Sequence, residues 1–466
     1  MSISYFLKKN FLKPTFFPAH NRGQALPSKL GKLLKMSPGY WDLPELPEIG
    51  SPTSINGLIP EVQREFAERF STNSCYFGVN GASGLIQSAI IAIANPGQYI
   101  LMPRNVHISV IKACALTNVI PIFFDLEFCE LTGQFLPINE NWFMKVLKHV
   151  NSREKELAGV ILVNPSYQGL SANIEPIINI CHDKNLPVLV DEAHGAYFLF
   201  CENFGLPKSA VQFKADLVIH SLHKSLNGLT QTAILWHQGS LINRNKLSKS
   251  IDLLQTTSPS SLLIASCEES IKDWLNNNSL DKYKKLILKA KSIFDDLEKK
   301  GIPLIKSQDP LKIILNTGKF GIDGFKADRF FYKKGLIAEL PELMTLTFCL
   351  GFSIQDDFAS LLERLWKELL SKTKIRKKIT VLKPPFGFVD IPEVPIAYAW
   401  RRDSYELPLK ESYGSISADI ICPYPPGIPL IIPGERIDQK RLKWILSHRE
   451  YFGDLLNSNI RVLKIK

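Results

Sequence analysis

An amine and a carboxylate stand at the ends of two apolar runs in this chain of 466 residues. Lys224 follows the run ADLVIH, and Asp191 ends the earlier run LPVLVD. Both runs are typical of strands buried in a parallel sheet, so both groups would reach the carboxyl edge of that sheet. A lysine can form a Schiff base with an aldehyde, and a carboxylate can keep a pyridine nitrogen protonated. The pair therefore predicts binding of pyridoxal 5'-phosphate.

Two further groups could hold the phosphate of such a cofactor. The segment 81–84 (GASG) follows the run CYFGVN and opens a helix, where free backbone N–H groups and the Ser83 hydroxyl would attract an anion. The same small residues also suit an ordinary turn. Ser221 and His223 flank Lys224 closely enough to reach the phosphate as well.

Histidines at strand ends offer contacts to the cofactor ring. His107 follows LMPRN and could stack on the ring, although a hydrogen-bonded histidine at a helix start explains it equally simply. His194 would lie at the pocket wall or make a structural hydrogen bond. Lys224 alone could be an exposed lysine that begins a helix, but the presence of Asp191 favours a partly desolvated amine with a lowered pKa.

Strand and helix patterns alternate around these residues and predict how they are positioned. Short β-branched runs are separated by helical segments, which is typical of an α/β protein with a mostly parallel sheet. After about residue 260 longer helices and a smaller α+β region follow. We predict an irregular N-terminal segment wrapped around an edge of the main domain, a cofactor-binding large domain, a small domain and a C-terminal region, with the bounds 1–56, 57–260, 261–380 and 381–466.

Composition excludes several other classes of protein. The net charge of +11 is dispersed, so we expect no nucleic-acid partner. No apolar stretch is long enough to span a membrane and no leader peptide is evident, which predicts a cytoplasmic protein. The eight cysteines lack metal-ligand spacing, and we expect neither zinc nor disulfides.

Seven segments, in order, resemble the pyridoxal-phosphate-dependent decarboxylases of ornithine, lysine and arginine, a branch of the aspartate-aminotransferase-like fold. They are VNGASG, RNVHIS, NPSYQGL, VDEAHGA, SLHKSLNGLTQ, TTSPSSLLIAS and CPYPPGIPLIIPGE. The resemblance runs from about residue 18 to 435 and matches the shorter bacterial forms, which lack a wing domain. It implies a lyase that releases carbon dioxide from a basic amino acid and yields an amine of the kind used in polyamine biosynthesis.

The resemblance also assigns roles by position. Lys224 would be the Schiff-base lysine, Asp191 the partner of the pyridine nitrogen and His107 the stacked residue. Ser83, Ser221 and His223 would bind the phosphate. Ala82 stands where the family usually has threonine, so one hydroxyl is missing from the phosphate loop.

Two further assignments reach beyond the cofactor. Thr257 and Ser258 would approach the cofactor of a neighbouring subunit, which implies a homodimer with shared active sites. Glu435, in the PGE motif, would face the distal cation of the substrate.

Two other functions remain open. An aminotransferase or aldol-type lyase would use the same lysine and aspartate, and Arg401, Arg402 and Arg436 could then hold a substrate carboxylate. A regulatory protein that has lost activity is suggested only by Ala82. Which basic amino acid is used cannot be read from these residues.

Overall fold

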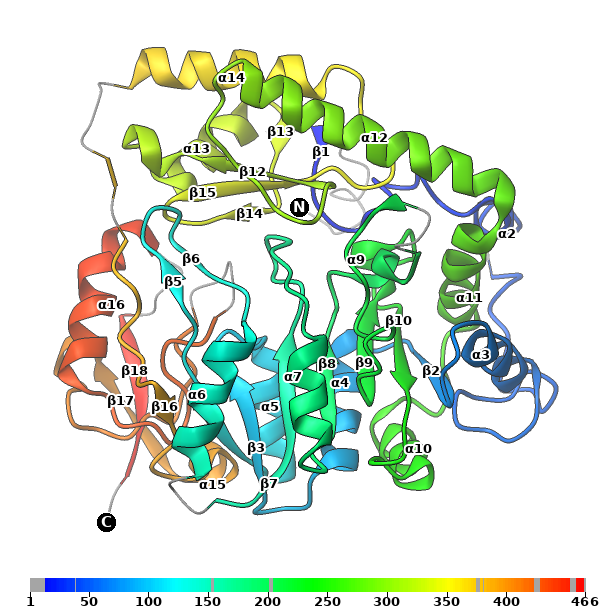
Figure 1. Ribbon diagram of the computed structural model, residues 1–466, viewed down its shortest axis with the longest axis horizontal. Coiled ribbons are helices and arrows are strands. Elements are labelled where there is room, and N and C mark those ends of the chain that lie inside the picture. The colour runs from blue at the N-terminus through cyan, green and yellow to red at the C-terminus, as the bar shows by residue number, and fades with distance from the viewer. Residues whose placement is uncertain are drawn as a thin grey trace.

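The computed structural model describes residues 13–37, 39–151, 155–200, 204–373, 378–379, 381–422, 428–452 and 458–464. Figure 1 shows a large sheet in the lower half of the molecule and a smaller sheet with two long helices above it, α12 (Asn277–Lys299) and α14 (Phe358–Lys372). The C-terminal helix α16 (Gln439–Phe452) lies at one side.

The large sheet has eight strands and confirms the predicted α/β class. Five neighbouring strands, from β4 to β9 in the sheet order, run parallel, and the strands at both margins are antiparallel. In spatial order the strands are β16 (Val389–Asp390), β4 (Ile120–Phe124), β3 (Tyr99–Pro103), β7 (Leu157–Val163), β8 (Val188–Asp191), β9 (Leu217–Ser221), β10 (Ala233–His237) and β2 (Ser74–Gly78).

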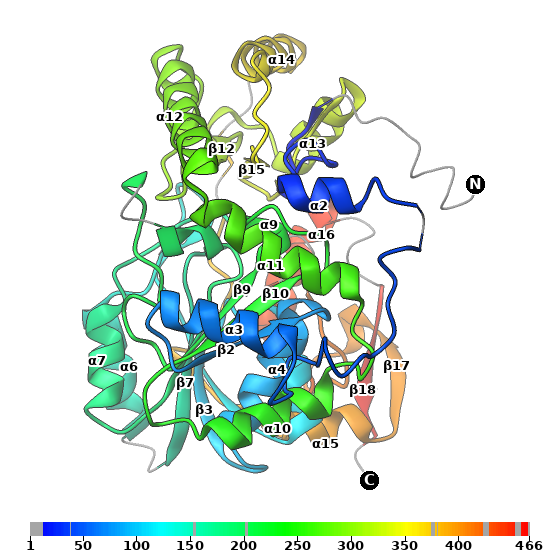
Figure 2. The ribbon, with the colours of Figure 1, turned by 90° about the vertical axis from the view of Figure 1, so that its right-hand side faces the viewer.

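Helices cover both faces of this sheet, which explains why its strands are apolar at nearly every position. In β7, Val160 and Leu162 enter one core and Ile161 enters the other. Figure 2 shows helices on both sides of the strands. One face carries α4 (Gly81–Ile93), α5 (Ile108–Thr117) and α10 (Arg244–Leu254), and the other carries α6 (Glu140–Asn151) and α7 (Glu175–His182), with α3 (Leu58–Arg69) and α11 (Ser261–Leu275) beside β2.

The smaller sheet is antiparallel and lies opposite the carboxyl edge of the large one. Its order is β11 (Leu304–Ile305), β12 (Lys312–Asn316), β15 (Thr345–Cys349) and β14 (Leu340–Pro341). Helix α12 buries one face, with Tyr283 and Ile287 in the core, and the chain turns after it at Gly301, whose φ of 76° suits glycine. Helix α13 (Gly324–Lys333) packs near β15.

The N-terminal segment joins the two sheets. Strand β1 (Lys13–Pro14) pairs with β13 (Leu336–Ile337) of the small domain, and the Ala19 N–H donates to the His223 carbonyl at 2.9 Å. Farther along, the Thr53 hydroxyl donates to Asp252 of α10 at 3.1 Å, so part of the segment also contacts the large domain. That it wraps an edge of the main domain stays a prediction. A segment this rich in proline offers few N–H donors, so it pairs over only two residues. The short helix α2 (Ser28–Leu33) follows.

The C-terminal region completes the large sheet and adds a separate two-stranded antiparallel sheet. Its elements are β16, α15 (Ile396–Arg401), β17 (Ser404–Pro408), α16 and β18 (Asn459–Leu463), and β17 pairs with β18. Residues 423–427 of the proline-rich motif 422–435 lie outside the described residues. The remaining short elements are β5 (Phe128–Cys129), β6 (Gln134–Phe135), α9 (Leu222–Ser225) and the 3-10 turns Ala196–Phe200, Gly318–Phe320 and Leu409–Glu411.

Across the described ranges, we find no helix with the length and apolarity that crossing a bilayer requires. The division of the chain at residues 56, 260 and 380 stays a prediction.

Candidate active site

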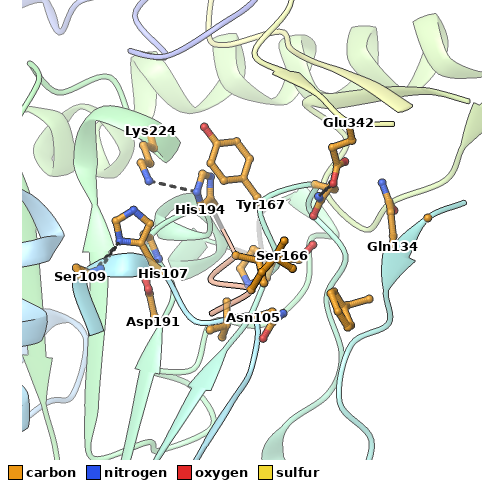
Figure 3. Close-up of a pocket in the computed structure, with 18 of the residues that line it drawn as sticks. Asn105, His107, Ser109, Gln134, Ser166, Tyr167, Asp191, His194, Lys224 and Glu342 are labelled. Carbon is orange, nitrogen blue, oxygen red and sulfur yellow. Dashed lines mark hydrogen bonds between the residues drawn. The ribbon is translucent and has the colours of Figure 1, made fainter. Parts of the chain in front are cut away.

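A cavity of about 390 Å³ lies between the carboxyl edge of the large sheet and the small domain. Eight of the residues predicted from the sequence line it together, although they come from four separate parts of the chain. They are Ala82, Ser83, His107, Asp191, His194, Ser221, His223 and Lys224. Figure 3 shows several of them facing this space.

Lys224 projects from the short helix α9, directly after β9. Its Nζ lies 3.2 Å from Nε2 of His194 and 5.7 Å from the centre of the Tyr167 ring. Burial lowers the pKa of Lys224, an effect that the charge of Asp191 opposes. A lysine with a lowered pKa is more often the neutral amine, which is the nucleophilic form.

Asp191 ends β8, and its side chain is almost buried, with 6% exposed. Its Oδ1 accepts the N–H of Ala193 at 3.2 Å. His107 lies next to Asp191 in Figure 3 and caps helix α5, where its Nδ1 accepts the N–H of Ser109 at 3.2 Å. Because Nδ1 accepts, the neutral ring carries its proton on Nε2. Burial lowers the pKa of His107, and Asp191 acts in the opposite direction.

The N-terminus of α4 supplies the predicted anion site. Gly81 has a φ of 66°, a conformation that few other residues adopt, and it lets the chain turn sharply from β2 into the helix. Asn80 makes no capping side-chain hydrogen bond, so the N–H groups of the first turn are oriented for an anion. Ala82 and Ser83 lie in that turn.

His223 and Ser221 border the same end of the cavity. The Nδ1–H of His223 donates to the Thr232 carbonyl at 3.2 Å, and burial lowers the pKa of His223 to about 4. A neutral His223 thus presents an acceptor at Nε2. To donate to a phosphate it must take up a proton, which a nearby dianion would favour.

This set of groups fits pyridoxal phosphate. An amine, a carboxylate, an imidazole and a helix N-terminus all face one cavity, and each suits a different part of that cofactor. Lys224 would hold the aldehyde carbon, Asp191 the pyridine nitrogen and the α4 turn the phosphate. His107 would lie against the ring.

Three residues that surround His194 were not singled out by the sequence analysis. His194 is packed between Tyr167, at 4.3 Å between ring centres, and Phe17, at 5.5 Å. Its Nδ1 lies 3.4 Å from Nζ of Lys312, a buried lysine of the small domain. Tyr167 lies in the segment NPSYQGL just after β7 and could have been found by the same strand-end signal, whereas Phe17 and Lys312 carry no such signal.

The opposite side of the cavity is lined by Gln134, Gln168 and Glu342, which the sequence also did not single out. Gln168 donates to the Glu342 carboxylate at 2.9 Å. These residues belong to loops and two-residue strands, so no regular pattern marks them.

Glu435 does not take the position expected of it. It does not line the cavity, and its carboxylate receives two hydrogen bonds from Arg104, at 2.7 and 2.9 Å, and an ion pair from Arg441 at 2.9 Å. Although burial disfavours ionisation, Arg104 holds the pKa of Glu435 below its usual range. Because both its oxygens are already matched by guanidinium groups, the structure does not support Glu435 as the group that binds the distal cation of the substrate.

Thr257 and Ser258 also lie outside the cavity lining of this chain. They are exposed between α10 and α11, where Ser258 N–H donates to Thr256 at 3.2 Å. Their predicted approach to a neighbouring subunit stays a prediction.

Fold and site together define a pyridoxal-phosphate enzyme with the aspartate-aminotransferase-like architecture. The solved constitutive lysine decarboxylase of Escherichia coli superposes with a TM-score of 0.76 at 18% identity, over 90% of this chain and 74% of that one. The yeast protein Bna3p, a putative kynurenine aminotransferase, gives a TM-score of 0.54 at 16% identity, over 77% of this chain and 90% of that one. These two likenesses show the fold alone.

The chain belongs to the Orn/Lys/Arg decarboxylase family. The model of that family's major domain matches residues 18–317, and the model of its C-terminal domain matches residues 392–455. An arginine decarboxylase of Halalkalibacterium halodurans is 30% identical over 92% of this chain and 88% of its own length. That of Bacillus subtilis is 28% identical over 92% and 89%.

The predicted class of enzyme is thereby confirmed. The protein is a pyridoxal-phosphate-dependent carboxy-lyase that acts on a basic amino acid. The family match favours this reaction over the aminotransferase and aldol-lyase alternatives.

Proposed function

We propose that the substrate is arginine and that the products are agmatine and carbon dioxide. Four relatives named arginine decarboxylase are 28–30% identical over 91–93% of this chain, whereas the lysine decarboxylase of Pseudomonas aeruginosa is 22% identical over 87%. The observation that carries the reaction itself is the meeting of Lys224 and Asp191 at one cavity.

Bound pyridoxal phosphate supplies a sink for the electron pair left on the substrate's Cα when carbon dioxide departs. Asp191 keeps a positive charge on the group it pairs with, because a buried carboxylate is stabilised by a cationic partner. His107 would limit the tilt of the cofactor ring that lies against it.

Lys224 and His194 handle protons on the cofactor side of the cavity. His194 lies 3.2 Å from Lys224, and burial holds the pKa of His194 well below its ordinary value, so its neutral ring can both donate and accept a hydrogen bond. Lys224 and His194 can therefore exchange a proton close to the reacting carbon. Tyr167 and Phe17 flank His194 and keep water from it.

Our proposal includes a homodimer in which Thr257 and Ser258 of one subunit approach the cofactor of the other. The exposure of both residues in the single chain supports this arrangement. Sedimentation at micromolar concentration should give twice the chain mass of 52.6 kDa.

The substrate is tested by parallel assays of arginine, lysine and ornithine labelled at C1. The cofactor-loaded protein should release labelled carbon dioxide from arginine with the highest kcat/KM. Lys224→Ala should abolish release, and Lys214→Ala, which removes an exposed lysine outside the cavity, should not. Faster release from lysine or ornithine would reject arginine as the substrate.

A further inference from the structure

Glu342 is a carboxylate held by neutral hydrogen-bond donors. It follows β14, and its half-buried side chain lines the cavity. Its oxygens accept hydrogen bonds from the Gln168 amide and the Thr345 hydroxyl, each at 2.9 Å. Within the part of the chain that the structure describes, no lysine or arginine forms an ion pair with it.

This environment is unfavourable for the ionised carboxylate. Burial raises the pKa of Glu342, and the neutral donors around it only partly offset that effect. A carboxylate in such a place is strongly stabilised when a cation arrives. Because Glu342 faces the cavity, that cation can come from a bound ligand.

Gln134 adds a second, independent observation. It lines the cavity with only 3% of its surface exposed, and neither its amide oxygen nor its amide nitrogen makes a well-aligned hydrogen bond within the described residues. The amide lies close enough to Glu342 to lower the pKa of that carboxyl, yet without good alignment. Buried amides without aligned partners are rare, so a missing polar ligand is the natural explanation.

Glu342 and Gln134 lie across the cavity from Lys224 (Figure 3). Figure 3 shows Lys224 and His194 on one side of the cavity and Glu342 and Gln134 on the other, with Tyr167 and Ser166 between them. A substrate whose α-amino end is at Lys224 would extend its far end toward Glu342.

We infer that Glu342, together with Gln134, binds the distal guanidinium group of the substrate. A guanidinium is planar and presents five N–H donors, more than one carboxylate accepts, so an additional amide oxygen beside the carboxylate suits it. An ammonium has three donors and would leave Gln134 less well satisfied. The inference rests on the proposed action on arginine and names the residues that recognise it.

Binding of agmatine tests this assignment apart from turnover. In Glu342→Gln, the new amide oxygen can accept from Gln168 while the amide nitrogen donates to the Thr345 hydroxyl, so the fold is expected to persist. Calorimetric titration should show that agmatine binds about 50-fold more weakly to this variant, the loss expected when a charged hydrogen-bonded pair is broken. The neutral analogue that carries a urea in place of the guanidinium should bind equally to both proteins. In assays, KM for arginine should rise more than kcat falls.

Asp328→Asn is the matched control. Asp328 is a half-buried acid of the same domain whose pKa burial raises to about 6, but it does not line the cavity. This variant should bind agmatine as the wild type does. Gln134→Leu leaves the carboxylate in place and should weaken agmatine binding about fivefold, which keeps the inference testable if Glu342→Gln fails to fold.

The outcomes separate the two claims. Suppose that the wild type decarboxylates arginine but that Glu342→Gln binds agmatine as tightly as the wild type does. The assignment of Glu342 is then overturned and the proposed function stands. If Glu342→Gln does not fold, unchanged binding by Gln134→Leu has the same meaning. If the wild type decarboxylates lysine or ornithine and not arginine, both claims are overturned. Weakened agmatine binding that spares the urea analogue supports both.

Discussion

The two sides of the cavity differ in the origin and the charge of their residues. The side that holds the cofactor is built from strand ends of the large sheet, and burial lowers the pKa of its basic groups, His107, His194 and Lys224. The side toward the small domain carries Glu342, whose pKa burial raises. Desolvation thus disfavours the charged forms of the bases on one side and of an acid on the other.

This difference separates groups that do chemistry from a group that recognises the substrate. Neutral bases can act as nucleophiles and proton acceptors. A desolvated acid gains most from a cationic ligand. Glu435 differs from Glu342 because two arginines of the same chain already pair with it, so it has a structural role.

The largest effect on rate is expected on the cofactor side. Asp191→Asn removes the negative charge that stabilises a protonated pyridine nitrogen, so kcat for arginine should fall by about two to three orders of magnitude. Steady-state kinetics at saturating arginine and cofactor measure this. A variant that kept a tenth of the wild-type kcat would contradict the role given to Asp191.

Glu435 and Glu342 should differ in their effect on folding. Glu435→Gln leaves the buried Arg104 without a carboxylate and Arg441 with Asp438 alone, so the free energy of unfolding should fall by about 3–5 kcal/mol. Glu342→Gln breaks no ion pair among the residues that the structure describes and should leave that energy nearly unchanged. Urea denaturation of both variants checks this. Equal denaturation midpoints would mean that the two carboxylates do not differ as described.

The contributions of His223 and Glu342 to folding stability should change with pH in opposite directions. Between the ordinary pKa of histidine, 6.5, and about 4, the unfolded chain binds a proton that folded His223 does not, so acidification destabilises the folded protein. Asn at position 223 can keep the donor to Thr232. His223→Asn should therefore lose about 2 kcal/mol less stability than the wild type between pH 7 and pH 5.

Glu342→Gln supplies the opposite case for the same denaturation series. Folded Glu342 retains its proton above pH 4.5 while the unfolded chain releases it, so wild-type stability from this group falls as pH rises. The variant should gain on the wild type as pH rises from 4.5. Parallel pH profiles for all three proteins would disprove both assignments.

The smallest effect concerns the phosphate turn. Ala82→Ser restores a hydroxyl to the first turn of α4, and one added hydrogen bond should tighten cofactor binding about fivefold. Absorbance titration of cofactor-free protein measures this affinity. An unchanged or weaker affinity would indicate that the side chain at position 82 does not face the phosphate.

The cofactor side could be predicted from the sequence because strand ends carry their own signal. Asp191 and Lys224 each end or follow a continuous apolar run, and parallel strands bring such positions to one edge. The distal side could not be predicted. Gln134 belongs to a strand of two residues and Glu342 to a turn, so only the packing of the small domain brings them together.

Glu435 shows where a motif alone misleads. The segment PGE marks the glutamate but says nothing about what surrounds it. The missed signal was Arg104, which directly follows the apolar strand β3; a buried arginine there requires a carboxylate partner, and Glu435 is that partner.

The N-terminal segment limits how the molecule can open. It is hydrogen-bonded to β13 and Phe352 near the small sheet and to the His223 carbonyl in the large domain, and its Phe17 packs on His194. The two halves are therefore tied together beside the reacting groups by a tether. If the two domains separate to admit an amino acid, the hydrogen bonds of this segment have to stretch or break. The free energy of those hydrogen bonds therefore adds to the barrier for substrate entry.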